Sequence, residues 1–201
     1  MVFDPLLMIM QPRHIDEAIV SLKNIDIPKV WFRAYTEPQV MVQMNQYIKE
    51  TNHSHYIVMS DDGIFRDHVS IHASTTDGLT KIGNCVIILN KAYIAHDCVV
   101  EDGVTLSCGV QIGGHVHVMK ESNLGMGAAV HQYQVIGSWS MIGMGGVVPK
   151  KSRIEPGHTW VGNPARRLKT NMYALDKLNV DDYMLVEETA RWSELIKEHG
   201  L

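Results

Sequence analysis

The segment from Ile82 to Val148 decides the fold, and its middle reads VTLSCGVQIGGHVHVMK over residues 104–120. Every sixth residue of the segment is isoleucine, leucine or valine, for twelve consecutive positions. The twelve are Ile82, Ile88, Ile94, Val100, Leu106, Ile112, Val118, Leu124, Val130, Ile136, Ile142 and Val148. Neither an α-helix, with about 3.6 residues per turn, nor a strand, with a period of about 2, produces a six-residue repeat.

A second, usually small residue follows most of these positions by four. The series is Ala92, Cys98, Val104, Val110, Val116, Ser122, Ala128, Ser140 and Gly146, and Gln134 is the exception. A coil with three flat faces produces this pattern, because each face is one short strand whose aliphatic residue points inward and whose small residue lets the chain turn. Three hexads make a turn of eighteen residues, and stacked turns pair their backbones at about 4.8 Å. The repeat predicts nearly four turns, and residues 69–79 add one more, so we assign residues 64–150 to the coil.

The flanking segments have different textures. Residues 1–63 alternate candidate strands (6–10, 30–35 and 56–59) with candidate helices, which predicts a small βαβαβ domain with a parallel sheet. Residues 151–201 begin with a loop at 162–165, and a helix is expected to open at Asp181 and end at Gly200. Leu185, Trp192, Leu195 and Ile196 share one face of that helix, which must pack on the coil or on a partner subunit. The predicted fold class is therefore mainly β, with a small N-terminal α/β domain and a C-terminal helical tail.

Composition excludes several classes of protein. The chain has 201 residues, 45% of them hydrophobic and 20% charged, which is ordinary for a globular protein. A net charge of -4 argues against nucleic acid as a partner, because phosphate binding favours a basic surface. The apolar run at residues 6–10 is too short for a membrane span, so no membrane insertion is expected. Three cysteines, an odd number, are interpreted as buried free thiols in a reducing cytoplasm.

Three histidines fall together in the register of the coil. Division by the eighteen-residue turn leaves remainders of six, seven and five for His96, His115 and His131. They are therefore expected along one edge of the prism, on three successive turns about 5 Å apart. A cluster of imidazoles suits proton transfer near neutral pH, and the adjacent Asp97 can orient the first of them.

The repeat resembles the left-handed β-helix acyltransferases. The runs Ile94–Cys98, Gly114–Val116 and Ala129–Gln132 are similar to the UDP-N-acetylglucosamine O-acyltransferases of the lipid A pathway. The run Gly162–Arg166 and an α/β domain before the coil look more like the sialic acid and nucleotide-amino-sugar acetyltransferases of the same superfamily. The resemblance implies a left-handed coil, and it implies a homotrimer with active sites between adjacent prisms.

The resemblance also implies roles for single residues. His96 would be the general base that Asp97 orients, and the backbone N–H of Gly114 would stabilise the oxyanion. The substrate or acyl donor would meet His115, His131, Gly113 and Tyr93, the last at a place where the lipid A enzymes have a further histidine. The phosphates of coenzyme A or of a carrier's phosphopantetheine would meet a basic group consisting of Lys150, Lys151, Arg166 and Arg167. No metal is implied by this interpretation.

These features predict an acyltransferase that moves an acetyl or other short acyl group from coenzyme A or an acyl carrier protein to a nucleotide-activated sugar. Such an enzyme would belong to lipopolysaccharide or surface glycan biosynthesis. Two alternatives stay open. The γ-class carbonic anhydrases share the coil and bind zinc through three histidines, and the coil could also be a scaffold without catalysis.

Overall fold

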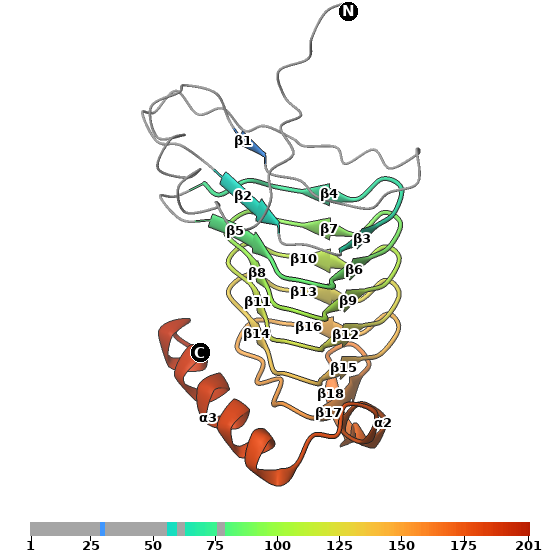
Figure 1. The fold of residues 1–201 in the computed structure, drawn as a ribbon, viewed down its shortest axis with the longest axis vertical. Coiled ribbons are helices and arrows are strands. Elements are labelled where there is room, and N and C mark those ends of the chain that lie inside the picture. Colours follow the sequence, from blue (N-terminus) through green and yellow to red (C-terminus); the bar gives the residue numbers. More distant parts are fainter. Residues whose placement is uncertain (1–28, 31–55, 60–62, 76–78) are drawn as a thin grey trace, which may run out of the picture.

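The computed structural model describes residues 29–30, 56–59, 63–75 and 79–201. Their short strands stack into a three-faced prism (Figure 1). Face A contains β1 (Lys29–Val30), β2 (Tyr56–Met59), β5 (Leu79–Ile82), β8 (Val99–Val100), β11 (His117–Val118) and β14 (Val135–Ile136). Face B contains β4 (Ser70–Ile71), β7 (Tyr93–Ile94), β10 (Gln111–Ile112), β13 (Ala129–Val130) and β16 (Val147–Val148). Face C contains β3 (Ile64–Phe65), β6 (Ile87–Ile88), β9 (Thr105–Leu106), β12 (Asn123–Leu124), β15 (Met141–Ile142), β17 (His158–Val161) and β18 (Arg166–Thr170).

Strand pairing confirms the predicted turn of eighteen residues. On face B, Gln111 pairs in parallel with Ala129, and the same spacing holds on faces A and C from β6 to β15. The additional turn expected before Ile82 is also present, but Ser70 pairs with Tyr93, which lies 23 residues on. This turn is therefore five residues longer than the regular turn of eighteen. The additional residues lie between β4 and β5, after Ala73.

The predicted inward positions form the core. All twelve aliphatic residues of the repeat are buried, with no side chain more exposed than the 4% of Val130. Gln134, the exception in the second series, is also fully buried, because its amide is satisfied: its Oε1 accepts from the Ser152 N–H at 2.9 Å and its Nε2 donates to the Gln132 carbonyl at 3.3 Å.

The cysteines are free, as expected, but they are not all buried. Cys98 lies in the core, Cys108 is partly exposed and Cys85 is exposed. The prediction of a buried Cys85 is wrong because this residue takes a left-handed corner position, with φ of 53°, whose side chain lies outside the prism.

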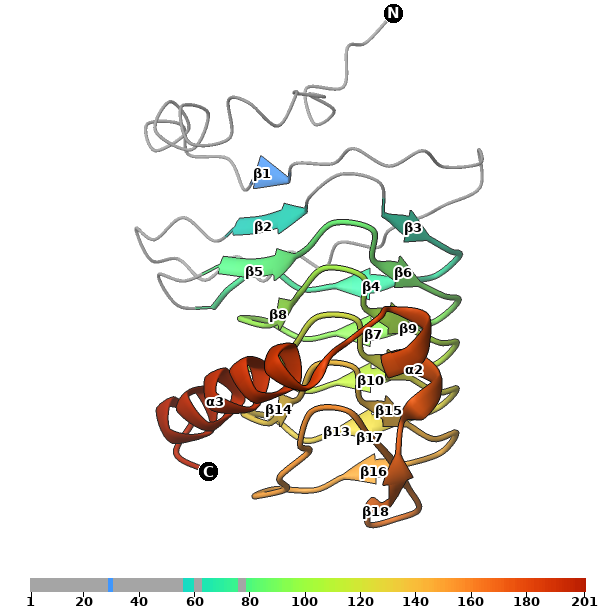
Figure 2. The same cartoon turned by 60° about the horizontal axis from the view of Figure 1, so that its bottom comes forward.

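The N-terminal strands of the described chain extend the coil. The strand predicted at residues 56–59 is present as β2, and it pairs in parallel with β5 and with β1, so face A continues beyond the repeat (Figure 2). The other strands and helices expected in residues 1–63 lie outside the described residues, and the domain boundaries at 63 and 150 stay predictions.

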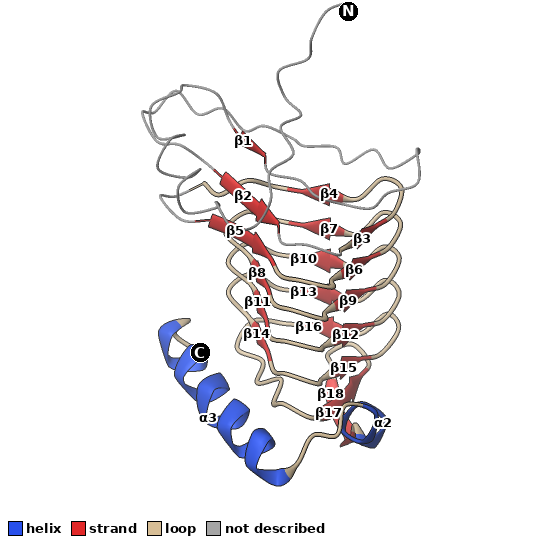
Figure 3. Cartoon of the chain, in the orientation of Figure 1, coloured by secondary structure: helices blue, strands red, loops and turns tan. Residues whose placement is uncertain are grey.

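The C-terminal tail turns back along the prism. The predicted loop at residues 162–165 is present, and it joins the antiparallel strands β17 and β18, which the sequence analysis did not predict. After this pair come α2 (Met172–Lys177) and α3 (Asp182–Glu198) (Figure 3). Asp181 caps α3 as predicted, since its side chain accepts a hydrogen bond from the Met184 N–H at 2.7 Å. No helix in the described part of the chain is both long and apolar enough to cross a membrane.

The inner side of α3 packs on face A. Trp192 and Ile196 form a small buried cluster with Met119 and Val135, which confirms that the predicted helix face covers the coil. The sequence placed this face correctly because its apolar residues recur at helical spacing.

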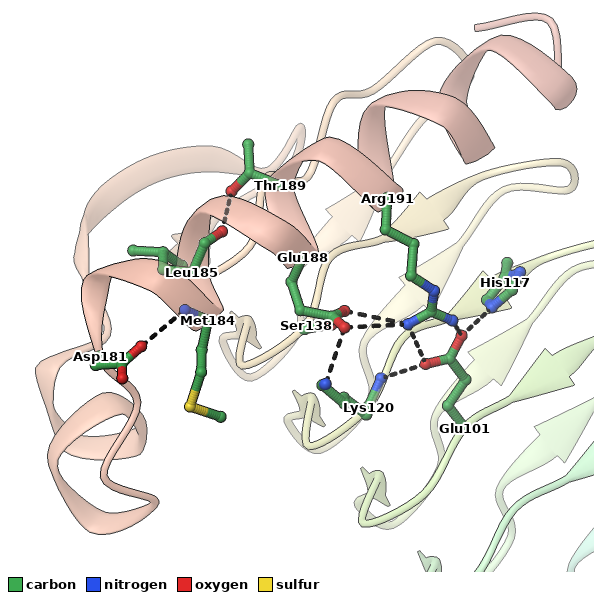
Figure 4. Close-up of polar contacts among 10 residues, drawn as sticks. All are labelled: Glu101, His117, Lys120, Ser138, Asp181, Met184, Leu185, Glu188, Thr189 and Arg191. Carbon is green, nitrogen blue, oxygen red and sulfur yellow. Dashed lines mark hydrogen bonds and ion pairs between the residues drawn. The ribbon is translucent and has the colours of Figure 1, made fainter.

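Ion pairs fix α3 beside this cluster. Glu101, on the coil, contacts both His117 and Arg191, while Glu188 of α3 contacts Arg191 at 3.1 Å and Lys120 at 2.8 Å (Figure 4). Burial raises the pKa of Glu101, but the hydrogen bonds from His117 and Arg191 outweigh it and lower this pKa to about 2.

The first prediction concerns the core. Ile112→Ala removes a fully buried side chain and is expected to reduce the free energy of unfolding by about 2–5 kcal/mol. Gln111→Ala, on the same strand but exposed, is expected to change it by less than about 0.5 kcal/mol. Denaturant titration of both variants measures the difference, and equal effects would contradict the assignment of the two faces of the strand.

The second prediction concerns pH. The folded pKa of Glu101 lies below the ordinary 4.5, so its stabilising effect is complete above about pH 4.5 and is lost as the pH falls through about 2. Glu101→Gln should therefore lose less stability than the wild type over this window. The control Glu187→Gln, on the outer side of α3, should keep the wild-type slope. A wild-type slope in Glu101→Gln would show that the pair does not form.

Candidate active site

The corner between faces B and A contains the sequence-predicted histidines. His96, His115 and His131 follow the face B strands β7, β10 and β13. Asp97 and His115 have left-handed backbones, with φ of 59° and 58°, which L-residues seldom adopt outside tight turns. The His115 N–H donates to the His96 carbonyl at 3.1 Å, so stacking of successive turns brings these side chains together.

The carboxylate of Asp97 holds the His96 ring. His96 Nδ1 lies 2.8 Å from Asp97 Oδ2, and the Asp97 side chain is only 6% exposed. The same carboxylate accepts hydrogen bonds from the hydroxyl of Ser74 and from the Thr75 N–H (3.1 Å) and hydroxyl (2.9 Å). Burial raises the pKa of Asp97, but these hydrogen bonds outweigh it and hold that pKa far below its ordinary value.

An ionised Asp97 determines which nitrogen of His96 is free. The carboxylate can only accept, so Nδ1 carries the proton and Nε2 presents its lone pair. This is the base–orienter arrangement of acyl-transfer triads, without a protein nucleophile.

Ser74 and Thr75 complete the site and were missed by the sequence analysis. Both lie in the five-residue expansion between β4 and β5, and Thr75 also places its hydroxyl 3.1 Å from His96 Nδ1. The signal was the interruption of the six-residue register before Leu79, because an insertion in a repeat commonly forms a loop on a functional face.

Gly114 lies against the free nitrogen of His96. A Cβ at this position would sit 2.8 Å from His96 Cε1 and 2.9 Å from His96 Nε2, so only glycine allows this approach. Among the described backbone hydrogen bonds, none has the Gly114 N–H as donor. The neighbouring Gly113 is equally confined, since a Cβ there would meet the Gln132 N at 2.6 Å.

Of the two other predicted histidines, His115 lies against the His96–Asp97 pair and His131 does not. The His115 ring is perpendicular to the His96 ring at 5.2 Å, and its Nε2 lies 3.8 Å from Asp97 Oδ2. His131 is exposed on the next turn, and its Nδ1 lies 3.0 Å from the Gln132 carbonyl.

Tyr93 packs its ring against that of His72, at 4.9 Å. Burial, and then the nearby His96, lower the pKa of His72. His72 is a second residue that the sequence analysis did not single out, because the shifted register of its turn hid its place beside the site.

The predicted basic group is divided between a corner of the prism and face C. Lys150 and Lys151 follow β16 at the corner that contains the histidines, and both are exposed. Arg166 and Arg167 lie on β18 in face C, where Arg167 pairs with Glu155 at 3.2 Å. The two lysines are therefore the members of this group that share the corner with His96.

Comparisons with known proteins agree with this fold. No family model matches the chain. The chain is 28% identical over 143 residues to the acyl-[acyl-carrier-protein]–UDP-N-acetylglucosamine O-acyltransferase of Gloeothece citriformis, covering 71% of this chain and 51% of that protein. The equivalent protein of Synechocystis is 28% identical over 153 residues, covering 73% and 53%. The chain thus spans about half the length of the curated relatives it matches.

Solved structures show the same architecture. The Arabidopsis UDP-N-acetylglucosamine acyltransferase matches with a TM-score of 0.64 at 24% identity, over 74% of this chain and 51% of that one. The Campylobacter jejuni enzyme matches with a TM-score of 0.66 at 19% identity, over 82% and 65%. The predicted fold, a left-handed parallel β-helix with a C-terminal helix, is confirmed, and so is the resemblance to the hexapeptide-repeat acyltransferases.

The third prediction tests the approach of Gly114 to His96. Gly114→Ala should displace the His96 ring, because the added methyl group would lie less than 3 Å from it. Ring signals of His96 in NMR spectra should shift, while the unfolding midpoint changes little. In the control Gly143→Ala the added methyl group would meet the Val161 side chain at 2.8 Å and the Trp160 carbonyl at 3.4 Å, away from His96, so the His96 signals should stay unchanged. Unchanged signals in Gly114→Ala would contradict the geometry.

Proposed function

We propose that the chain is an acyltransferase that moves an acyl group from a thioester donor to a hydroxyl or amine of a nucleotide-activated sugar. The observation that carries the proposal is the His96 ring, oriented by the ionised Asp97, with the bare backbone of Gly114 against its free nitrogen. The names of the curated relatives, which act on UDP-N-acetylglucosamine with an acyl carrier protein, support the same reaction class.

His96 acts as general base. Its Nε2 takes the proton from the acceptor group as the acceptor oxygen or nitrogen forms a bond to the thioester carbonyl carbon. The negative charge that develops on the carbonyl oxygen is stabilised by the Gly114 N–H. Collapse of the tetrahedral intermediate breaks the carbon–sulfur bond, and the proton on His96 passes to the leaving thiolate. Asp97 stays ionised throughout and stabilises the imidazolium.

The donor is coenzyme A carrying an acetyl or other short acyl group, or an acyl carrier protein. Lys150 and Lys151, exposed on the same corner three turns from His96, would pair with its phosphates, with Arg166 and Arg167 further along the tail. His115, His131, Gly113 and Tyr93 would contact the substrates. We further propose a cytoplasmic homotrimer whose sites lie between prisms, acting in lipopolysaccharide or surface glycan biosynthesis.

The metal alternative depends on a different set of ligands. His96, Asp97 and His115 offer ligand atoms within 4.8 Å of one another, but His131 is not part of this group. Both Asp97 oxygens already accept hydrogen bonds from Ser74, Thr75 or His96, which favours an orienting carboxylate over a ligand. Elemental analysis of the purified protein distinguishes the acyltransferase hypothesis from the zinc-enzyme hypothesis, since one zinc per chain would overturn the acyltransferase proposal.

The fourth prediction tests the base. His96→Ala should lower kcat by about 10²–10⁴-fold, because general-base catalysis contributes about this much, while the free energy of unfolding stays close to that of the wild type. Asp97→Asn should also lower kcat, since an amide can stabilise the wrong tautomer of His96. Acyl transfer from acetyl coenzyme A and from acyl carrier protein to UDP-N-acetylglucosamine is the assay.

His131→Ala, on the same edge but away from His96, is the matched variant and should affect KM more than kcat. Full activity of His96→Ala with either donor would remove the mechanism.

A further inference from the structure

The corner that contains His96 continues, one and two turns further along, with the rings of His115 and Tyr133. Asp97, His115 and Tyr133 occupy the same position on three successive turns, and each has a left-handed backbone, with φ of 59°, 58° and 64°. The Tyr133 N–H donates to the Gly114 carbonyl at 2.9 Å, so the register that aligns His115 with His96 also aligns Tyr133 with His115.

Tyr133 lies flat on the imidazole of His115. The two ring centroids are 4.5 Å apart and the planes differ by only 4°, whereas the His115 and His96 rings are perpendicular. His115 therefore has a flat aromatic contact on one side and the His96–Asp97 pair on the other. Rotation of its ring about the Cβ–Cγ bond would drive an edge into the Tyr133 ring, so the stack restricts the plane of the imidazole.

The end of α3 holds Tyr133 from outside. His199, just beyond α3, lies with its Nδ1 3.3 Å from the Tyr133 carbonyl, and its ring makes an edge contact with that of His117, with 6.3 Å between the centroids. The ion pairs of Glu101 and Glu188 fix the same helix on face A. The helix that covers face A thus also supports the turn that carries Tyr133.

The side chain of Tyr133 has no role in the core. It is 45% exposed, and a bulky residue in a left-handed conformation is unfavourable at an exposed corner. The contact with His115 explains why an aromatic residue is found at this position.

We infer that Tyr133 is a positioning residue, which acts on the reaction by fixing the plane of the His115 imidazole beside the His96–Asp97 pair. The inference rests on the proposed function for its effect on rate, but the stack itself can be tested without any acyl transfer. Because the ring and not the hydroxyl makes the contact, phenylalanine should replace Tyr133.

The test combines kinetics with a double-mutant cycle. Tyr133→Asn removes the ring and keeps a residue that tolerates the left-handed backbone. It should lower kcat/KM by about 10–100-fold, a loss typical of a displaced group near the reacting centre. The same change in a His115→Ala background should have less than about twofold further effect, since Tyr133 acts through His115. Tyr133→Phe should restore near wild-type kcat/KM.

Two controls keep the result interpretable. Lys91→Asn introduces asparagine at another exposed left-handed position, with φ of 60°, at the corner between faces C and B, and should leave kcat/KM unchanged. If Tyr133→Asn does not fold, Tyr133→Gly removes the ring and relieves the backbone strain. Equal losses in the wild-type and His115→Ala backgrounds, or an inactive Tyr133→Phe, would overturn the inference.

A second readout does not depend on activity. ¹³C relaxation of the His115 ring should show increased motion in Tyr133→Asn and wild-type order in Tyr133→Phe. Unchanged motion in Tyr133→Asn would overturn the inference even if acyl transfer is established. Increased motion in a chain without acyl transfer would support the stack while removing the proposed function, so the two failures are distinguishable.

Discussion

Parallel stacking of eighteen-residue turns is the constraint on which the rest of the structure depends. A strand of two residues is too short to be stable alone, so each is stabilised by the same strand one turn above and below and by the aliphatic side chains inside the prism. From β6 to β15 the register also fixes the corners. A residue that is eighteen positions from another lies directly beside it, and a side chain placed once on an edge can be repeated along it.

The candidate site is built from this regularity and from one departure from it. The turns bring His115 and Gly114 against His96, and left-handed corners aim the side chains outward. The five-residue expansion between β4 and β5 then supplies Ser74 and Thr75, whose hydrogen bonds keep Asp97 ionised despite its burial. The repeat alone would place a histidine beside an aspartate; the expansion fixes which nitrogen of His96 carries a proton.

Much of this could be predicted from the sequence, because the six-residue period assigns every residue of the coil to a face or a corner. The buried positions from Ile82 to Val148, the shared edge of His96 and His115, and the helix that opens at Asp181 all follow from spacing. Contacts across an irregular register could not be predicted in this way. Ser74, Thr75 and His72 lie where the repeat is interrupted, and the β17–β18 pair lies after it ends. The exposure of Cys85 depended on a backbone conformation that spacing does not specify.

We propose that a sugar nucleotide and a thioester meet at His96 Nε2. A crystal structure with UDP-N-acetylglucosamine and an unreactive thioether analogue of an acyl donor tests it most directly. We expect an acceptor hydroxyl or amine within about 3.2 Å of His96 Nε2, with the donor carbonyl oxygen directed at the Gly114 N–H. Well-ordered ligands bound at another corner of the prism, with His96 open to solvent, would contradict this proposal.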